Sequence, residues 1–178
     1  SLRHRKESGV LSSFNLKLFD PVLLCPYTRI ILLDSDVIFL RTPGRIKKWI
    51  QSGEKTSLYA RHFVYPDFVK EDVDLPWLVI LRMYRERINP KIDFGFNSGL
   101  LCIDRRTYSL ARVEKLMSYL YTVGLGTTWA PEQYIFSALI AESNHGLFDK
   151  THVHVHSIKE FIKMIPRPYT CTFIHFAF

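Results

Sequence analysis

The amino-acid sequence predicts an α/β layered domain. Apolar runs of strand length alternate along the chain with segments whose apolar residues recur at helical spacing, as in proteins whose helices cover a sheet. The length of 178 residues is that of one domain, and the content of 47% hydrophobic and 23% charged residues is typical of a globular protein. We therefore expect residues 1–178 to form a single domain.

Five helices are expected from their boundary residues. The first begins at Ser12 or Ser13, which can cap it, and stops at Pro26. The others start at a proline or an acidic cap and end near glycine or an Asn-Pro pair, over residues 43–53, 74–89, 104–124 and 131–139. Strands are expected within residues 29–40, 57–60, 94–103, 152–156 and 171–176, and residues 61–73 are expected to form a loop over a site.

Composition excludes several classes of protein. The apolar runs are far shorter than the ~20 residues that a membrane span requires. The net charge of +7 fits a polyanionic partner, such as nucleotide phosphates or an anionic membrane surface, but the basic residues form no dense stripe, which argues against nucleic acid. The three cysteines are widely spaced and suggest neither a disulfide framework nor a zinc ribbon, so a reducing cytoplasm is the expected compartment.

The most informative stretch is Asp34-Ser35-Asp36, which follows a run of β-branched and leucine residues. Two carboxylates so close together stay ionised at the end of a buried strand only beside a cation or dense hydrogen bonding. Ligands collect at the carboxyl ends of strands in open α/β sheets, so a divalent metal is the simplest counterion. An acidic turn between two strands is the alternative.

Three further stretches contain candidate site residues. Asn97 and Ser98 have glycines on both sides, which lets the backbone approach a ligand, although a β-bulge also fits. Glu132 lies in the first turn of an expected helix, where acids often only balance the helix dipole. His175 and the alternating histidines of residues 152–156 can bind metal, but a hydrogen-bonded core histidine and a half-exposed strand are the simpler interpretations.

Together these residues resemble the retaining glycosyltransferases related to glycogenin and to the bacterial lipopolysaccharide galactosyl- and glucosyltransferases. That family has a GT-A fold, a Rossmann-like layered α/β/α arrangement. The resemblance rests on motifs that occur here in the family's order: a helix over residues 14–27 with a basic residue at Lys17, the Asp-x-Asp motif at Asp34-Ser35-Asp36, Phe-Asn-(Ser/Ala)-Gly at Phe96-Asn97-Ser98-Gly99, an Asp-Gln pair at Glu132-Gln133, and a terminal His-Phe at His175-Phe176.

The resemblance implies metal-dependent transfer of a hexose from a nucleoside-diphosphate sugar, expected to be a UDP-sugar, with retention. Asp34, Asp36 and His175 would bind Mn²⁺ or Mg²⁺, which stabilises the departing phosphate as a Lewis acid. Lys17 would add a second positive charge at the phosphates. The family's donor site also covers Ser35, and the acceptor would be a glycan or a lipid-linked glycan, at a cytoplasmic location or peripheral to a membrane.

The same resemblance places the sugar among four side chains. The amides of Asn97 and Gln133 would hold sugar hydroxyls, Ser98 would lie at the donor site, and Glu132 would orient the sugar or stabilise the developing cation. The family begins with a strand and helix that hold the base, whereas nothing before Ser12 supplies them. We therefore expect a GT-A fold without its N-terminal base-binding strand, and regard the sequence as a fragment.

Two other classes of function fit parts of the sequence. A non-catalytic domain of the same fold could bind a glycan or a protein. The run that ends in Asp34-Ser35-Asp36 also resembles the opening motif of haloacid-dehalogenase-like phosphatases, in which the first aspartate is the nucleophile. That family needs a second acidic cluster, and no acidic pair follows Ile103.

Overall fold

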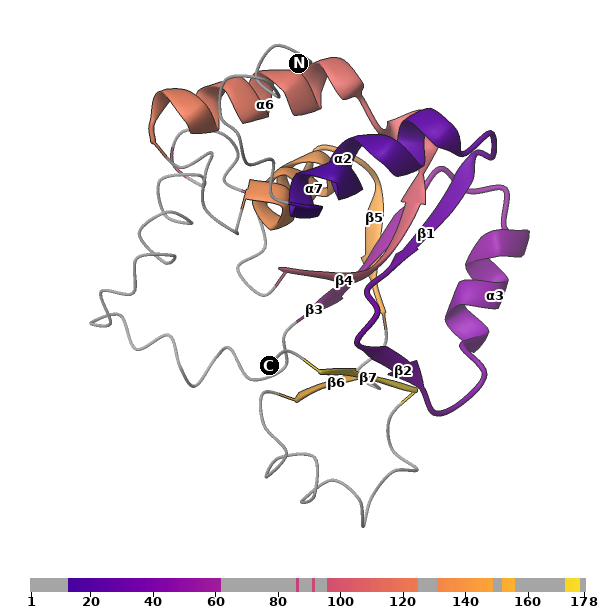
Figure 1. Cartoon of the computed structure of the whole chain (residues 1–178). Coiled ribbons are helices and arrows are strands. Elements are labelled where there is room, and N and C mark those ends of the chain that lie inside the picture. Colours follow the sequence, from indigo (N-terminus) through magenta and orange to yellow (C-terminus); the bar gives the residue numbers. More distant parts are fainter. Residues whose placement is uncertain are drawn as a thin grey trace.

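The computed structural model describes residues 13–61, 86, 91, 96–124, 131–148, 152–155 and 172–176. The expected loop over residues 61–73 and the expected helix over 74–89 lie outside these residues, apart from single positions at 61 and 86. In the described part, helices α2, α3, α6 and α7 and seven strands form a layered α/β structure, shown in Figure 1. None of the described helices has the length and apolar character needed to cross a lipid bilayer.

The larger sheet has the strand order β1-β4-β3-β5. Strand β4 (Phe96–Asp104) is buried at every residue because it pairs antiparallel with β1 (Arg29–Leu33) on one side and with β3 (Ser57–Arg61) on the other. Strand β5 (His145–Leu147) pairs in parallel with β3. This strand was not expected from the sequence. Its three residues are too few to show a period.

The smaller sheet has the order β2-β7-β6 and contains β7, the last described strand. Strand β7 (Phe173–Phe176) pairs antiparallel with β2 (Val37–Phe39) and parallel with β6 (His152–Val155). The strand expected within residues 29–40 ends before Asp34, and Asp34-Ser35-Asp36 form the turn between two strands that was the alternative interpretation. A turn closed by the bond from the Val37 amide to the Asp34 carbonyl, at 3.2 Å, passes the chain from one sheet to the other.

Helices lie on both faces of the larger sheet, because side chains of β4 alternate between two apolar clusters. Leu101 and Ile103 pack in a cluster with α2 (Ser13–Leu24), α6 (Leu110–Thr122) and α7 (Pro131–Ala141), whereas Leu100 and Cys102 pack with α3 (Gly44–Gln51). Figure 1 shows the two helical layers on opposite sides of β1 and β4. The expected α/β/α arrangement is confirmed.

The helix expected from Asp104 begins later. The Asp104 carboxylate accepts from the Arg106 amide and caps a short 3-10 helix, Arg105–Thr107, instead. The Ser109 hydroxyl caps α6 by accepting from the Arg112 amide at 3.2 Å. Two successive caps explain the shift, since each satisfies amides that a single continuous helix would have bonded internally. The expected end is correct: Gly124 follows α6 with a φ of 75°, which favours glycine.

Candidate functional site

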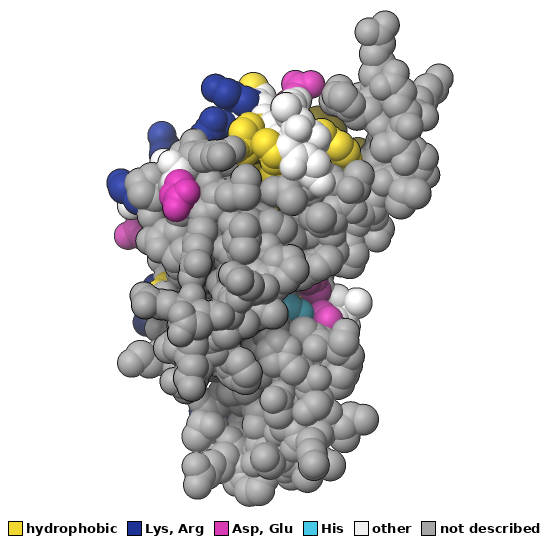
Figure 2. Space-filling model, turned by 90° about the vertical axis from the view of Figure 1, so that its left-hand side faces the viewer, with side chains coloured by type: hydrophobic (Ala, Val, Ile, Leu, Met, Phe, Trp, Pro, Cys, Tyr) yellow, Lys and Arg dark blue, Asp and Glu magenta, His cyan; other side chains and the backbone are white. Residues whose placement is uncertain are grey.

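Three of the predicted site residues converge where the two sheets meet. Asp34 and Asp36 lie in the turn between β1 and β2, and His175 lies on β7 opposite Val37. One ligand atom from each of the three side chains falls within 4.8 Å of the others. We call this group the candidate cation site. Figure 2 shows a histidine side chain beside acidic side chains on one face of the molecule.

The imidazole of His175 is held on two sides. Its Nδ1 lies 3.1 Å from the amide oxygen of Asn97, and its ring lies over Gly99, where an added Cβ would overlap the ring. Only 10% of its side-chain surface is exposed. Burial lowers the pKa of His175, although the carboxylates of Asp36 and Asp34 oppose this change. The neutral imidazole, which is the form that binds metals, is therefore favoured.

The geometry fits a divalent cation. Oδ1 of Asp36 is buried, and it lies 3.2 Å from Nε2 of His175. Two such atoms that face each other are satisfied either by a proton on Nε2 or by a cation between them. Ligand atoms that share one ion lie at most about 4.2 Å apart at Mg²⁺ distances of about 2.0 to 2.1 Å, and at most about 5.2 Å apart at Ca²⁺ distances of about 2.3 to 2.6 Å. The three ligand atoms lie within 4.8 Å of one another, so they would move a few tenths of an ångström closer together around Mg²⁺.

Lys17 contacts one carboxylate of the candidate cation site. Its Nζ donates to Oδ1 of Asp34 at 2.6 Å and to the carbonyl oxygen of Ser98 at 2.8 Å. A second carboxylate, that of Glu132, lies 3.4 Å away. The resemblance placed this lysine at the donor phosphates, and the structure adds that α2 delivers its ammonium to two acids. Lys17 thus lowers the electrostatic cost of burying these carboxylates.

Glu132 is the buried acid of the site. It lies in the first turn of α7 and is 3% exposed, and its Oε2 accepts from the Ser98 hydroxyl at 3.2 Å. Burial raises the pKa of Glu132 above its usual range, while the Lys17 ammonium opposes that rise. Its contacts with Ser98 and Lys17 show that Glu132 does more than balance the dipole of α7, which was the simpler interpretation of its position.

The remaining predicted residues lie nearby in different roles. The amide nitrogen of Gln133 donates to the carbonyl oxygen of Phe96 at 2.9 Å, so this amide ties α7 to β4. Ser35 is exposed in the turn between the two aspartates. The sequence analysis did not predict a role for Gly99 by itself. Its position next to Asn97 and Ser98 was the signal that could have indicated one.

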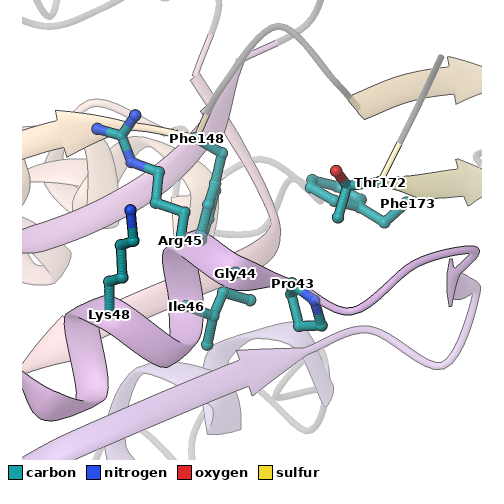
Figure 3. A pocket seen from close by; sticks show the side chains of 8 residues that line it. All are labelled: Pro43, Gly44, Arg45, Ile46, Lys48, Phe148, Thr172 and Phe173. Carbon is teal, nitrogen blue, oxygen red and sulfur yellow. The ribbon is translucent and has the colours of Figure 1, made fainter.

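A separate cavity of about 520 Å³ lies on the α3 side of β7. Figure 3 shows Arg45 and Lys48 projecting from α3 on one side, with Thr172 and Phe173 on the other. Apolar side chains make up much of its wall: Pro43, Ile46, Phe148 and Phe173. No residue of the candidate cation site lines this cavity, so it is not part of the site.

No known family model matches the sequence, and no curated protein matches it. Solved structures do. The WbbM bifunctional glycosyltransferase, in its apo structure, matches with a TM-score of 0.58 and 17% identity over 95% of this chain and 32% of that chain. The chain has a GT-A-like glycosyltransferase fold. It spans about a third of that structure. Mouse xyloside xylosyltransferase 1, also in its apo form, matches with a TM-score of 0.44 and 15% identity, over 91% of this chain and 62% of that chain.

The GT-A-like fold confirms the predicted fold class. At this level of identity the likeness extends to the fold, and the assignment to the glycogenin-like branch stays a prediction from the sequence motifs. The candidate cation site adds an observation that the fold likeness does not contain. It joins the Asp-x-Asp and His-Phe motifs, which lie about 140 residues apart in the sequence, in one cluster of side chains.

Proposed function

We propose that this domain transfers a hexose from a nucleoside-diphosphate sugar, with UDP-sugar as the expected donor, to a hydroxyl of a glycan acceptor. The observation that carries the proposal is the convergence of Asp34, Asp36 and His175 within 4.8 Å. These residues would hold Mn²⁺ or Mg²⁺, which supplies Lewis-acid stabilisation of the departing diphosphate. The GT-A-like fold supports the same class of reaction.

The chain's own residues then supply charge and orientation. The Lys17 ammonium, held by Asp34 and Ser98, provides a fixed positive charge beside the cation site. The carboxylate of Glu132 lies 3.4 Å from this ammonium and would contribute negative charge where the anomeric carbon becomes cation-like. As the bond from this carbon to the diphosphate oxygen breaks, an acceptor hydroxyl oxygen forms the new bond and its proton passes to the departing diphosphate, with retention expected from the motifs.

The proposal is tested by thermal unfolding with Mn²⁺ alone, UDP alone and both together. A ligand that binds the folded state raises the melting temperature, and a jointly bound pair raises it most when both are present. We expect Asp36→Ala to abolish the joint effect and Glu54→Ala, a change at an exposed side chain, to preserve it. An unchanged rise in Asp36→Ala would remove Asp36 from the site, and no rise in the wild type would contradict the proposal.

Turnover separates the enzyme from a non-catalytic domain of the same fold. We expect UDP release from a UDP-hexose in the presence of Mn²⁺, and none after Asp36→Ala. Joint binding of Mn²⁺ and UDP without turnover would favour the binding domain. The alternative as a haloacid-dehalogenase-like phosphatase gains no support from a GT-A-like fold, and hydrolysis of a phosphate ester without a sugar nucleotide would be needed to restore it.

A membrane-surface acceptor and a cytoplasmic location are part of the proposal. The net charge of +7 permits a lipid-linked acceptor at an anionic membrane surface, as it does a soluble acceptor. Sedimentation with vesicles that contain anionic lipids tests this, since binding by scattered basic residues weakens as salt increases. Equal binding to neutral vesicles would contradict it.

A further inference from the structure

The side-chain amide of Asn97 has a defined orientation. Its Oδ1 accepts from the backbone amide of Gly99 at 2.9 Å. A backbone N–H can only donate, so the atom that faces it must be the oxygen of the side-chain amide. Asn97 is 6% exposed and lies near the start of β4, which is buried along its length. The backbone of β4 therefore fixes which end of this amide points toward the site.

The same oxygen determines where His175 carries its proton. Oδ1 of Asn97 lies 3.1 Å from Nδ1 of His175. An amide oxygen accepts and never donates, so a hydrogen bond at this distance requires a proton on Nδ1. Nε2 faces the Asp36 carboxylate, so without a cation a proton on Nε2 would bond to that carboxylate, and a bound cation would replace that proton.

The ring is also fixed in place by what lies beneath it. A Cβ added at Gly99 would overlap Nδ1, Cε1 and Nε2, so this edge of the ring lies against the glycine backbone. With Nδ1 on Asn97, Nε2 points to Oδ1 of Asp36 at 3.2 Å. Turning the ring over would place carbon atoms at both polar contacts. The arrangement thus directs Nε2 at the candidate cation site.

We propose that Asn97 is a positioning residue, which fixes the Nδ1–H tautomer of His175 and so presents Nε2 to a divalent cation. This inference rests on the proposed function, because it assigns a role toward the same cation. It also changes the expected role of Asn97, whose amide the sequence motif placed on a sugar hydroxyl. Partners of this kind around a ligating histidine set its tautomer and its basicity in metal sites generally.

The test uses nitrogen NMR of the protein labelled at histidine, with metal removed by chelator, at a pH above the ordinary histidine pKa of about 6.5. His175→Gln identifies the resonances of His175 by their loss. We expect a protonated Nδ1 in the wild type, whether or not Nε2 also carries a proton shared with Asp36. Asn97→Asp keeps an acceptor oxygen and should keep this tautomer, whereas Asn97→Leu should shift the proton toward Nε2.

Mn²⁺ affinity, measured by calorimetry, is the second readout. We expect Asn97→Leu to weaken binding by about 10- to 100-fold, the usual effect of losing a partner of a metal-ligating histidine. Asn97→Asp should bind within a few-fold of the wild type or more tightly. Asn97→Asp also guards against misfolding, because its oxygen can still accept from the Gly99 amide.

Two results would overturn the inference: an Nε2–H tautomer in the wild type, or an unchanged Nδ1–H tautomer together with unchanged Mn²⁺ affinity in Asn97→Leu. Failure of the proposed function gives a different pattern. In that case the wild type shows the Nδ1–H tautomer and its loss in Asn97→Leu, but neither protein binds Mn²⁺. That pattern would support the tautomer assignment and contradict the binding of a cation at this site.

Discussion

The backbone amide of Asp34 donates to the carbonyl oxygen of Gly99, with 2.9 Å between the two atoms. This bond joins the turn that carries two carboxylates to the strand that carries Asn97. The amide of Gly99 holds the oxygen of Asn97, and the space above Gly99 contains the ring of His175. Three segments that are distant in sequence therefore meet at one glycine, and its backbone sets their relative positions.

The first prediction follows from the missing side chain. Gly99→Ala should weaken Mn²⁺ binding by at least about 10-fold, because the new Cβ overlaps the His175 ring and must displace it. Gly53→Ala is the matched control, since an added Cβ there meets nothing within 4 Å. Calorimetry with Mn²⁺ measures both variants. Equal affinity for Gly99→Ala and Gly53→Ala would show that His175 does not contribute to the site.

The second prediction concerns the ammonium of Lys17. Lys17→Met should lower the free energy of unfolding in metal-free buffer by about 1 to 3 kcal/mol, because it leaves the buried carboxylate of Glu132 and the half-buried carboxylate of Asp34 without this partner. Adding Mn²⁺ should stabilise this variant more than the wild type, since an oxygen of Asp34 no longer bonds to the ammonium. Urea unfolding with chelator and with Mn²⁺ measures both effects.

The exposed Lys115 on α6 provides the control for this change. Lys115→Met should alter neither the stability nor the gain on adding Mn²⁺ by more than about 0.5 kcal/mol, as is usual for surface substitutions. If Lys17→Met behaved like Lys115→Met, the ion pairs of Lys17 would not contribute to the free energy of unfolding.

The layered fold was predictable from the sequence because its signals are local. Apolar residues at helical spacing marked α6 and α7, and the continuous apolar run of β4 marked a strand buried on both faces. The meeting of Asp34, Asp36 and His175 was predictable for another reason. Their motifs resemble a family in which these positions share a site, and the structure does bring them together.

Other features could not be predicted because they depend on tertiary contacts. An acidic turn between two strands was one interpretation of Asp34-Ser35-Asp36, but the strand pattern on either side does not report that β1 and β2 belong to different sheets. The partners of Lys17 lie up to 115 residues away, and helical spacing does not report them. Likewise, a glycine that makes room for a ring and a glycine in a bulge look the same in sequence, so the contact between Gly99 and His175 required the structure.

The third prediction concerns acid stability. The Arg106 side chain donates to the buried Asp104 carboxylate at 2.8 Å and, chiefly through this bond, lowers the pKa of Asp104. The folded state therefore binds protons less readily than the unfolded chain, whose aspartate pKa is about 3.9. The stabilisation is complete above that value and is lost as the pH falls through the lower, folded pKa.

Asp104→Asn should make the free energy of unfolding depend less steeply on pH below about 4, since this carboxylate no longer titrates. Urea unfolding at several pH values gives the slope for each protein. Glu54→Gln, at an exposed side chain, should leave the wild-type slope unchanged. A slope in Asp104→Asn as steep as that of the wild type would assign the acid sensitivity to other carboxylates.

The fourth prediction concerns Cys102, which is fully buried in β4 beside Leu58 on β3. Burial raises the pKa of its thiol to about 12, so at pH 8 very little of the reactive thiolate is present. We expect iodoacetamide to modify Cys102 only after unfolding in urea, and at least about 100-fold more slowly than the partly exposed Cys25 in the native protein. Peptide mass spectrometry distinguishes the two sites. Comparable native rates would mean that the packing between α3 and the sheet opens readily, because local opening is the route by which a reagent reaches this strand.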